Sequence, residues 1–95
     1  MIGAWAVTYD HLEGKESKVS GPRGVTLSHS EIVNHPDAQK FRMLDDDGNV
    51  YYTGFCIVGG EYESDFAPLD DYGAPNAGCT GIQYQDGPNG SWEYL

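Results

Sequence analysis

The sequence predicts a mainly β (α+β) fold of about five antiparallel strands in hairpins, with one short helix near residues 28-35. Three observations lead to this prediction. The 13 glycines and 5 prolines stand between short apolar runs, as in turn-rich β proteins. Two turn sequences, Asp47-Gly48 and residues 86–90, interrupt runs rich in aromatic and β-branched residues, which is typical of hairpins. A single capping box, Ser28 with Glu31, marks the start of a helix.

We expect a single domain over residues 1–95. A chain of 95 residues is long enough to bury one modest core. Its 39% hydrophobic and 13% aromatic residues exceed what a disordered chain carries. The sequence shows no apolar run near the ~20 residues of a membrane span, and we expect no secretory leader. We therefore expect no membrane contact and a cytoplasmic location, in the host cytoplasm if the protein is viral.

The first element predicted is a strand over residues 3–10. Its period of two places Trp5, Val7 and Tyr9 on one face, as in a half-buried strand. Residues 11–24 mix Gly, Ser, Pro and both charge signs without any period, so we expect a mobile connection there.

The helix is predicted to begin at Ser28. Ser28 as N-cap and Glu31 three residues later satisfy each other's backbone N–H groups in a capping box. Leu27 and Ile32 have the positions of a hydrophobic staple across this N-terminus. Pro36 disfavours helical backbone at the residue before it, so the helix is short.

The central hairpin is predicted from residues 41–44 and 50–58. Asp47-Gly48 between them is a favoured two-residue type I′ turn, since both residues accept a positive φ. The resulting register places Met43 opposite Tyr52 and Leu44 opposite Tyr51.

Residues 61–66 are predicted to be extended and to pair beside this hairpin. Their alternation places Glu61, Glu63 and Asp65 on one side, with Tyr62 and Phe66 on the other. On a strand the three carboxylates would span roughly 13 to 14 Å, a scale compatible with part of a DNA phosphate track.

The rest of the chain is predicted to form a loop and a second hairpin. Residues 68–78 are expected to be a loop that exposes Asp70 and Asp71 and tucks Tyr72 back as an anchor. Residues 79–85 and 91–95 are then expected to pair as strands across the 86–90 turn.

Several stretches resemble a group of small acidic open reading frames of bacterial, archaeal and viral genomes. They are GPRG (21–24), EIVNHPDA (31–38), FRMLDDDGNVYYTG (41–54), FAPLDDYGAPNAGCT (66–80) and IQY (82–84). The resemblance covers most of the chain and implies a compact single-domain protein. It implies no established activity and transfers no site residues.

The negative charge is unevenly distributed along the chain. Of the 15 acids and 5 bases, five acids and all five bases lie in residues 1–42. Residues 43–95 therefore hold the other ten acids and no base. Solubility alone usually intersperses Lys and Arg, so this asymmetry favours a continuous negative field on the folded surface. An acidic proteome or chance are the alternatives.

Metal and catalytic sites are not predicted. Asp45, Asp46 and Asp47 suggest calcium, but counting from Asp45 an EF-hand loop needs Gly where Val50 stands and Glu where Cys56 stands. The histidines and cysteines lack zinc-ligand spacings, and no nucleophile has a plausible base. We expect no cofactor and no enzymatic activity. The two cysteines, Cys56 and Cys79, are expected to be buried small hydrophobes rather than a disulfide.

The function expected is therefore that of a non-enzymatic acidic binding protein whose negative face occupies a basic groove on a protein partner. Such grooves are found on nucleic-acid-binding proteins. We therefore expect this protein to contact the basic face of a nucleic-acid-binding protein and not to contact nucleic acid directly. The concrete form is a DNA-mimic inhibitor of a host defence nuclease or CRISPR complex. The expected partner-binding residues are Asp45, Asp46, Asp47, Glu61, Glu63, Asp65, Asp70 and Asp71. The alternatives are an assembly domain acting through apolar self- or complex-association and, second, a calcium-binding module.

Overall fold

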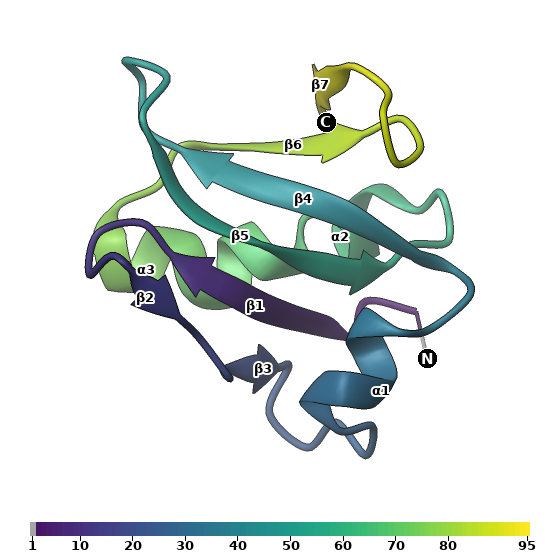
Figure 1. The fold of residues 1–95 in the computed structure, drawn as a ribbon. Coiled ribbons are helices and arrows are strands. Elements are labelled where there is room, and N and C mark those ends of the chain that lie inside the picture. The colour runs from purple at the N-terminus through teal and green to yellow at the C-terminus, as the bar shows by residue number, and fades with distance from the viewer. Residues whose placement is uncertain (1) are drawn as a thin grey trace.

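An antiparallel sheet of seven strands forms the centre of the molecule (Figure 1). The structure is a computed structural model, and it describes residues 2–95. The strand order is β2-β1-β5-β4-β6-β7, with β3 pairing separately with β1. The strands are β1 (Trp5–Asp10), β2 (Lys15–Glu16), β3 (Ser20–Gly21), β4 (Ala38–Leu44), β5 (Val50–Ile57), β6 (Gly81–Gln85) and β7 (Trp92–Tyr94). The mainly β antiparallel prediction is confirmed, with more strands than the expected five.

Four short helical segments accompany the sheet, where the sequence predicted one. They are α1 (His29–Val33), α2 (Tyr62–Asp65), the π-helical turn η1 (Leu69–Gly73) and α3 (Ala74–Ala77). The predicted helix is α1, and both hydrogen bonds of its Ser28–Glu31 capping box are present. None of the helices in residues 2–95 has the length and apolarity that crossing a membrane requires.

The central hairpin forms as predicted but with a different turn. Met43 pairs with Tyr52 as expected, whereas Leu44 pairs with Val50 because the register shifts between Met43 and Leu44. No described residue other than glycine has a positive φ, so the type I′ prediction is wrong. Within this turn only Gly48 has a positive φ, of +82°. It closes a three-residue loop over residues 46–48, an arrangement in which one strand residue bulges beside the turn.

The first strand, β1, has an irregularity in its pairing just before Tyr9. The pairing of β1 with β5 shifts between Val7 and Tyr9, so Tyr9 leaves the apolar face on which the sequence placed it and is 37% exposed. The expected mobile connection, residues 11–24, is also wrong in part, because β2 and β3 within it pair along the edge of β1.

Residues 61–66 were predicted to be extended, but Tyr62–Asp65 within them form the helix α2 instead. Gly60, with φ +77°, redirects the chain before α2. Tyr62 and Phe66 are four residues apart, and their ring centroids lie 5.2 Å apart on one helix face. A spacing of four satisfies both periods, because i and i+4 lie on one side of a strand and also on one face of a helix. This ambiguity explains the wrong prediction.

The predicted loop over residues 68–78 is also helical. It contains η1 and α3, and Gly78 at φ +72° ends α3. The expected anchor is confirmed, since the ring of Tyr72 packs at 5.4 Å from that of Trp5 and 5.0 Å from that of Tyr52. The second hairpin is confirmed too, as β6 and β7.

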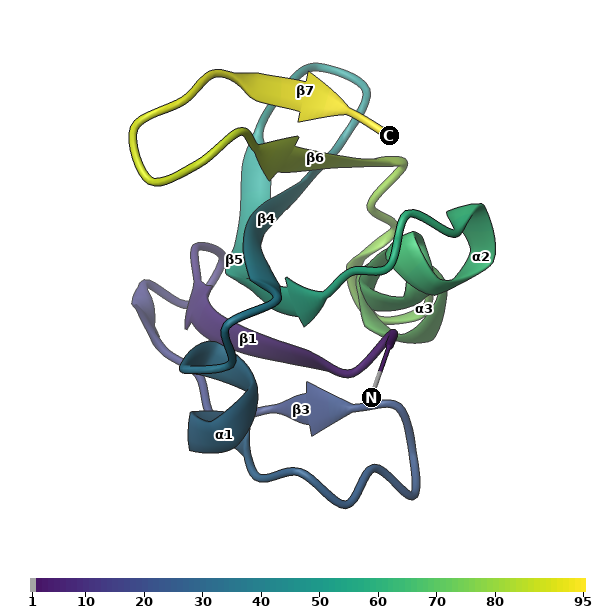
Figure 2. The same cartoon turned by 90° about the vertical axis from the view of Figure 1, so that its right-hand side faces the viewer.

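The sheet has one covered face and one largely open face. Figure 2 shows it curling around the segment from α2 to α3, while α1 lies on the other side. Alternate residues of each strand point into the core between the sheet and this segment, and Phe41 and Met43 are fully buried there. On the opposite side Ile32 of α1 covers only Ala4, Ala6 and Ile57. We call residues 61–77 the helical layer, and the uncovered part of the opposite side the open face.

The helical layer packs closely on the sheet. A Cβ at Gly73 would stand 2.5 Å from Sδ of Met43, so only glycine lets the η1 backbone approach so near. Cys56 and Cys79 are free thiols buried in this core, as predicted.

Candidate functional site

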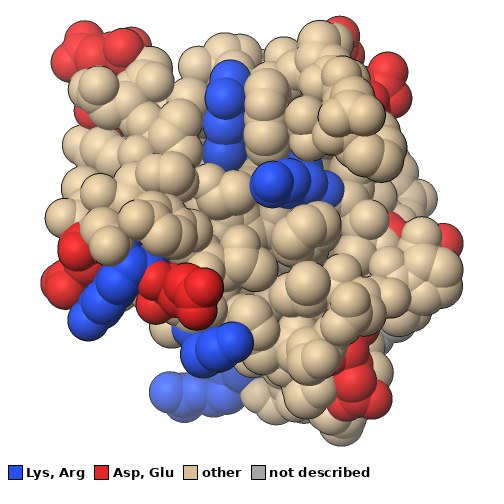
Figure 3. Space-filling model, in the orientation of Figure 1, with Lys and Arg blue, Asp and Glu red and all other residues tan. Residues whose placement is uncertain are grey.

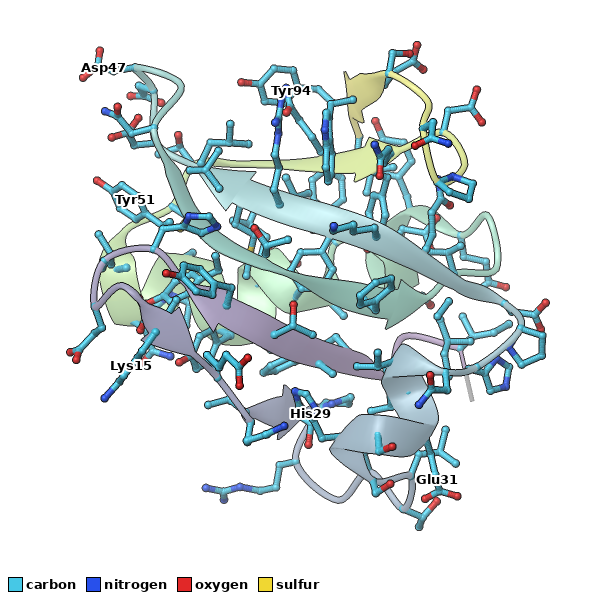
Figure 4. All side chains as sticks on the ribbon, in the orientation of Figure 1. Lys15, His29, Glu31, Asp47, Tyr51 and Tyr94 are labelled. Carbon is cyan, nitrogen blue, oxygen red and sulfur yellow. The ribbon has the colours of Figure 1, made fainter. Side chains whose placement is uncertain are left out.

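The eight predicted partner-binding residues fall into two groups. Asp45, Asp46 and Asp47 occupy the loop between β4 and β5, and Figure 4 labels Asp47 at the tip of this loop. The other five lie in the helical layer, which begins beyond the far end of β5. The eight-residue strand β5, about 26 Å long, separates the first group from the start of the helical layer. The layer then returns toward the β4–β5 loop, since Phe66 lines a hollow together with Asp45 and Asp46.

Asp45 holds the hairpin loop together. Its Oδ1 accepts the backbone N–H groups of Asp47 and Asn49 at 2.9 Å. Its Oδ2 accepts the side-chain amide of Asn49 at 2.9 Å and the hydroxyl of Tyr51 at 3.1 Å. Two hydrogen bonds from Asn49 lower the pKa of Asp45, and the one from its side-chain amide has a larger effect than the one from its backbone N–H. Both carboxylate oxygens of Asp45 accept hydrogen bonds from within the hairpin, so Asp45 stabilises the turn.

Three more of the eight residues are held by contacts within the fold. Asp46 accepts the hydroxyl of Thr80 at 2.6 Å, which fixes the hairpin loop to the start of β6. Asp71 Oδ2 accepts the indole N–H of Trp5 at 3.0 Å. Asp65 is only 7% exposed, and its Oδ1 accepts the backbone N–H of Gly59 at 3.4 Å. The line of carboxylates expected from Glu61 to Asp65 therefore does not form.

The remaining four carboxylates are exposed and unpaired. Asp47, Glu61, Glu63 and Asp70 are all exposed, and the one ion pair within residues 2–95 joins Lys15 to Glu13. Glu61 is the N-cap of α2, but its side chain makes no cap hydrogen bond. Three of the four belong to the helical layer, so the acidic surface available to a partner is concentrated there.

Basic side chains lie over the opposite side of the molecule. Figure 3 views the open face, with Lys and Arg toward its middle and lower part and most Asp and Glu at its margins. Lys40 and Arg42 of β4 point to this side, because Phe41 and Met43 between and beyond them point into the core. Arg42 donates from Nε to Oε1 of Gln83 at 2.6 Å, and its guanidinium lies 4.4 Å from the ring centroid of Trp92.

The basic open face was not predicted from the sequence, where Lys40 and Arg42 belong to an N-terminal half with as many bases as acids. The signal was present, because both bases alternate with the buried residues of a strand and must share one side of it.

Metal-ligand chemistry has no assembled site in the described chain. Within residues 2–95, no group of three or more His, Cys, Asp or Glu side chains is placed to hold one ion. The aspartates that suggested calcium use their oxygens differently, since both oxygens of Asp45 accept turn hydrogen bonds.

Comparison with known proteins adds no further assignment. No family model matches this chain, and no curated protein or solved structure matches it significantly.

Proposed function

We propose that this protein is a non-enzymatic acidic binding protein whose helical layer contacts a basic surface on a protein partner. One observation carries the proposal. The chain between β5 and β6 contains five acids and no base, and it folds as one layer on the covered side of the sheet, while Lys40 and Arg42 point to the other side. A surface of one charge sign steers oppositely charged partners toward it and repels others.

The contact residues proposed are the exposed carboxylates Glu61, Glu63 and Asp70. They lie at the start of α2, within it and in η1, so they do not form the line of carboxylates that a strand would match to phosphate spacing. Support for the proposal therefore comes from charge, and the basic groove of a nucleic-acid-binding protein is the kind of surface that complements it. Inhibition of a host defence nuclease or CRISPR complex by DNA mimicry is the finer form of this proposal.

Paired charge reversals test the acidic helical layer. Glu61→Lys with Glu63→Lys is compared with Glu13→Lys with Glu16→Lys, two exposed acids near β2, so both variants change the net charge by the same amount. The partner is captured from the native host at low salt, and its affinity for the wild type and both variants is then measured at two salt concentrations.

We expect the helical-layer variant to lose about tenfold or more in affinity and the β2 variant to lose about threefold or less, because steering depends on where charges lie. Duplex DNA should compete with the protein for the partner if the DNA-mimic form is right. Equal losses from both variants would reduce the contact to net charge and contradict the proposal. Binding that is independent of salt and of both variants would favour an assembly domain acting through exposed aromatic residues such as Tyr62 and Tyr94, which are 68% and 63% exposed.

A further inference from the structure

The open face contains a hollow with an unusual set of residues for so acidic a protein. It encloses about 320 Å³ and is lined by Ala38, Gln39, Lys40, Phe55, Gln85, Gly87 and Pro88. This volume is at the lower end of small-molecule sites. It lies on the side of the sheet opposite to the helical layer, so it is independent of the surface proposed above to bind a basic partner.

The floor of the hollow combines an aromatic ring with a cation. Lys40 of β4 and Phe55 of β5 are direct cross-strand partners, so their side chains emerge side by side from the sheet. Phe55 is only partly buried, although large aromatic side chains are usually placed where they can be covered. A flat ligand stacked on this ring would cover it.

The cation in the hollow has no acidic partner. The chain has 15 acids for 5 bases, yet within residues 2–95 the one ion pair is Lys15–Glu13. Asp86, in the loop between β6 and β7, is not among the residues that line this hollow. It lines a neighbouring hollow together with Glu93. Lys40 is therefore available to an anion that does not have to displace a carboxylate.

The wall of the hollow is held in place by two glutamine side chains. Gln39 donates from Nε2 to the backbone oxygen of Gln85 at 2.9 Å, and Gln85 donates from Nε2 to the backbone oxygen of Gly90 at 3.2 Å. These bonds fix the loop containing Gly87 and Pro88 beside the floor. Each bond uses one of the two N–H groups of its amide and so orients that amide, while the Oε1 atoms stay able to accept from N–H or O–H donors of a ligand.

We propose that this hollow binds a small planar aromatic molecule carrying a phosphate or carboxylate group. The aromatic ring stacks on Phe55 and contacts Pro88, the anionic group pairs with Lys40, and the glutamine oxygens accept from polar edges of the ring. The small volume and the single cation restrict the ligand to one aromatic unit with one anionic group.

NMR titration of the full chain tests the proposal. Amide shifts of the 15N-labelled protein are followed with adenosine 5′-monophosphate and, separately, with indole-3-acetate, at about 0.1 M salt so that general repulsion is screened. Adenosine supplies the ring without the anion, and inorganic phosphate supplies the anion without the ring. We expect saturable shifts confined to residues 38–40, Phe55 and 85–90 for at least one of the two anionic aromatic probes.

Three variants assign the roles. Lys40→Gln should weaken binding of the anionic probe by about threefold, as expected for a solvent-exposed ion pair, and leave adenosine unchanged. Phe55→Leu should weaken every aromatic probe. Lys15→Gln makes the same charge change on the edge strand β2 (Lys15 is labelled in Figure 4) and should have no effect. The spectra themselves report whether each variant is folded.

Several results would overturn the proposal. One is the absence of saturable shifts with both anionic aromatic probes up to about 10 mM, since a Kd above this concentration corresponds to less than about 3 kcal/mol of binding free energy. Another is phosphate alone reproducing the full pattern of shifts, since the ring would then play no part. Equal losses from Lys40→Gln and Lys15→Gln would show that net charge, and not the hollow, controls binding.

Discussion

The two faces of the sheet differ although they are formed by the same strands. On β4, Phe41 and Met43 are fully buried, whereas Lys40 and Arg42 between and beside them point to the open face. On β5, Cys56 is buried while its neighbour Phe55 is partly exposed. The difference arises because the helical layer covers the core residues of one face, while α1 covers only a small part of the other.

This difference also separates the charges of the molecule. Residues 61–77 bury apolar side chains such as Leu69 against the sheet, and all their carboxylates except that of Asp65 are left exposed. The bases of β4 point the opposite way. Covering one face thus places Glu61, Glu63 and Asp70 on one side of the sheet and Lys40 and Arg42 on the other, so the two proposed binding surfaces lie on opposite sides of the sheet.

The largest effect that tests this comparison involves two phenylalanines. Phe41 and Phe55 lie on adjacent strands and on opposite faces. Phe41→Ala should lower the free energy of unfolding by about 3 to 5 kcal/mol, because it leaves a cavity in the core. Phe55→Ala should lower it by about 1 kcal/mol, because the ring is only partly buried. Urea denaturation measures both, and equal losses would mean that the open face is covered in solution.

Thiol chemistry gives the second test, since both cysteines lie on the covered face. Burial raises the pKa of Cys56 and of Cys79 from 9.0 to about 11. At pH 8 the folded thiols should react with iodoacetamide about 100-fold more slowly than those of the unfolded chain, because the thiolate is the reactive form. Labelling followed by mass spectrometry measures these rates.

The same shifts predict how stability depends on pH. Between pH 9.0 and about 11 the unfolded chain releases thiol protons that the folded chain retains, so stability falls as the pH rises through this range. Cys56→Ala and Cys79→Ala should each remove part of this alkaline dependence. A fast reaction of either thiol at pH 8 in the folded protein would show that the helical layer opens to solvent.

The smallest effect concerns the attachment of the helical layer. Asp71→Ala removes the hydrogen bond from Trp5 and should lower the free energy of unfolding by about 1 kcal/mol. Asp70→Ala, at the adjacent exposed position, should change it by less than about 0.5 kcal/mol. Thermal or urea denaturation separates the two, and identical effects would mean that the Trp5–Asp71 contact does not hold the layer.

Local signals in the sequence were sufficient for the elements that depend on near neighbours. The capping box predicted α1, because Ser28 and Glu31 satisfy backbone groups only three residues away. The aromatic and β-branched runs around Asp47-Gly48 predicted the central hairpin. The predicted turn type was wrong. The side chain of Asp45 accepts hydrogen bonds from Asp47, Asn49 and Tyr51, and so it stabilises a longer loop than the Asp47-Gly48 dipeptide alone suggests.

The tertiary structure decided everything that depends on distant residues. Residues 61–66 fit a strand and a helix equally well by spacing, and they are helical where the apolar face of the sheet has to be covered. That choice buries Asp65, attaches Asp71 to Trp5 and leaves Glu61, Glu63 and Asp70 exposed. Together with Asp45 and Asp46, which are held in the β4–β5 loop, four of the eight predicted carboxylates are used by the fold. The sequence by itself determined the sheet, the first helix and the excess of negative charge. Which carboxylates and which bases face solvent together was decided only by the packing of the helical layer, because burial of apolar area is set by contacts between segments far apart in the chain.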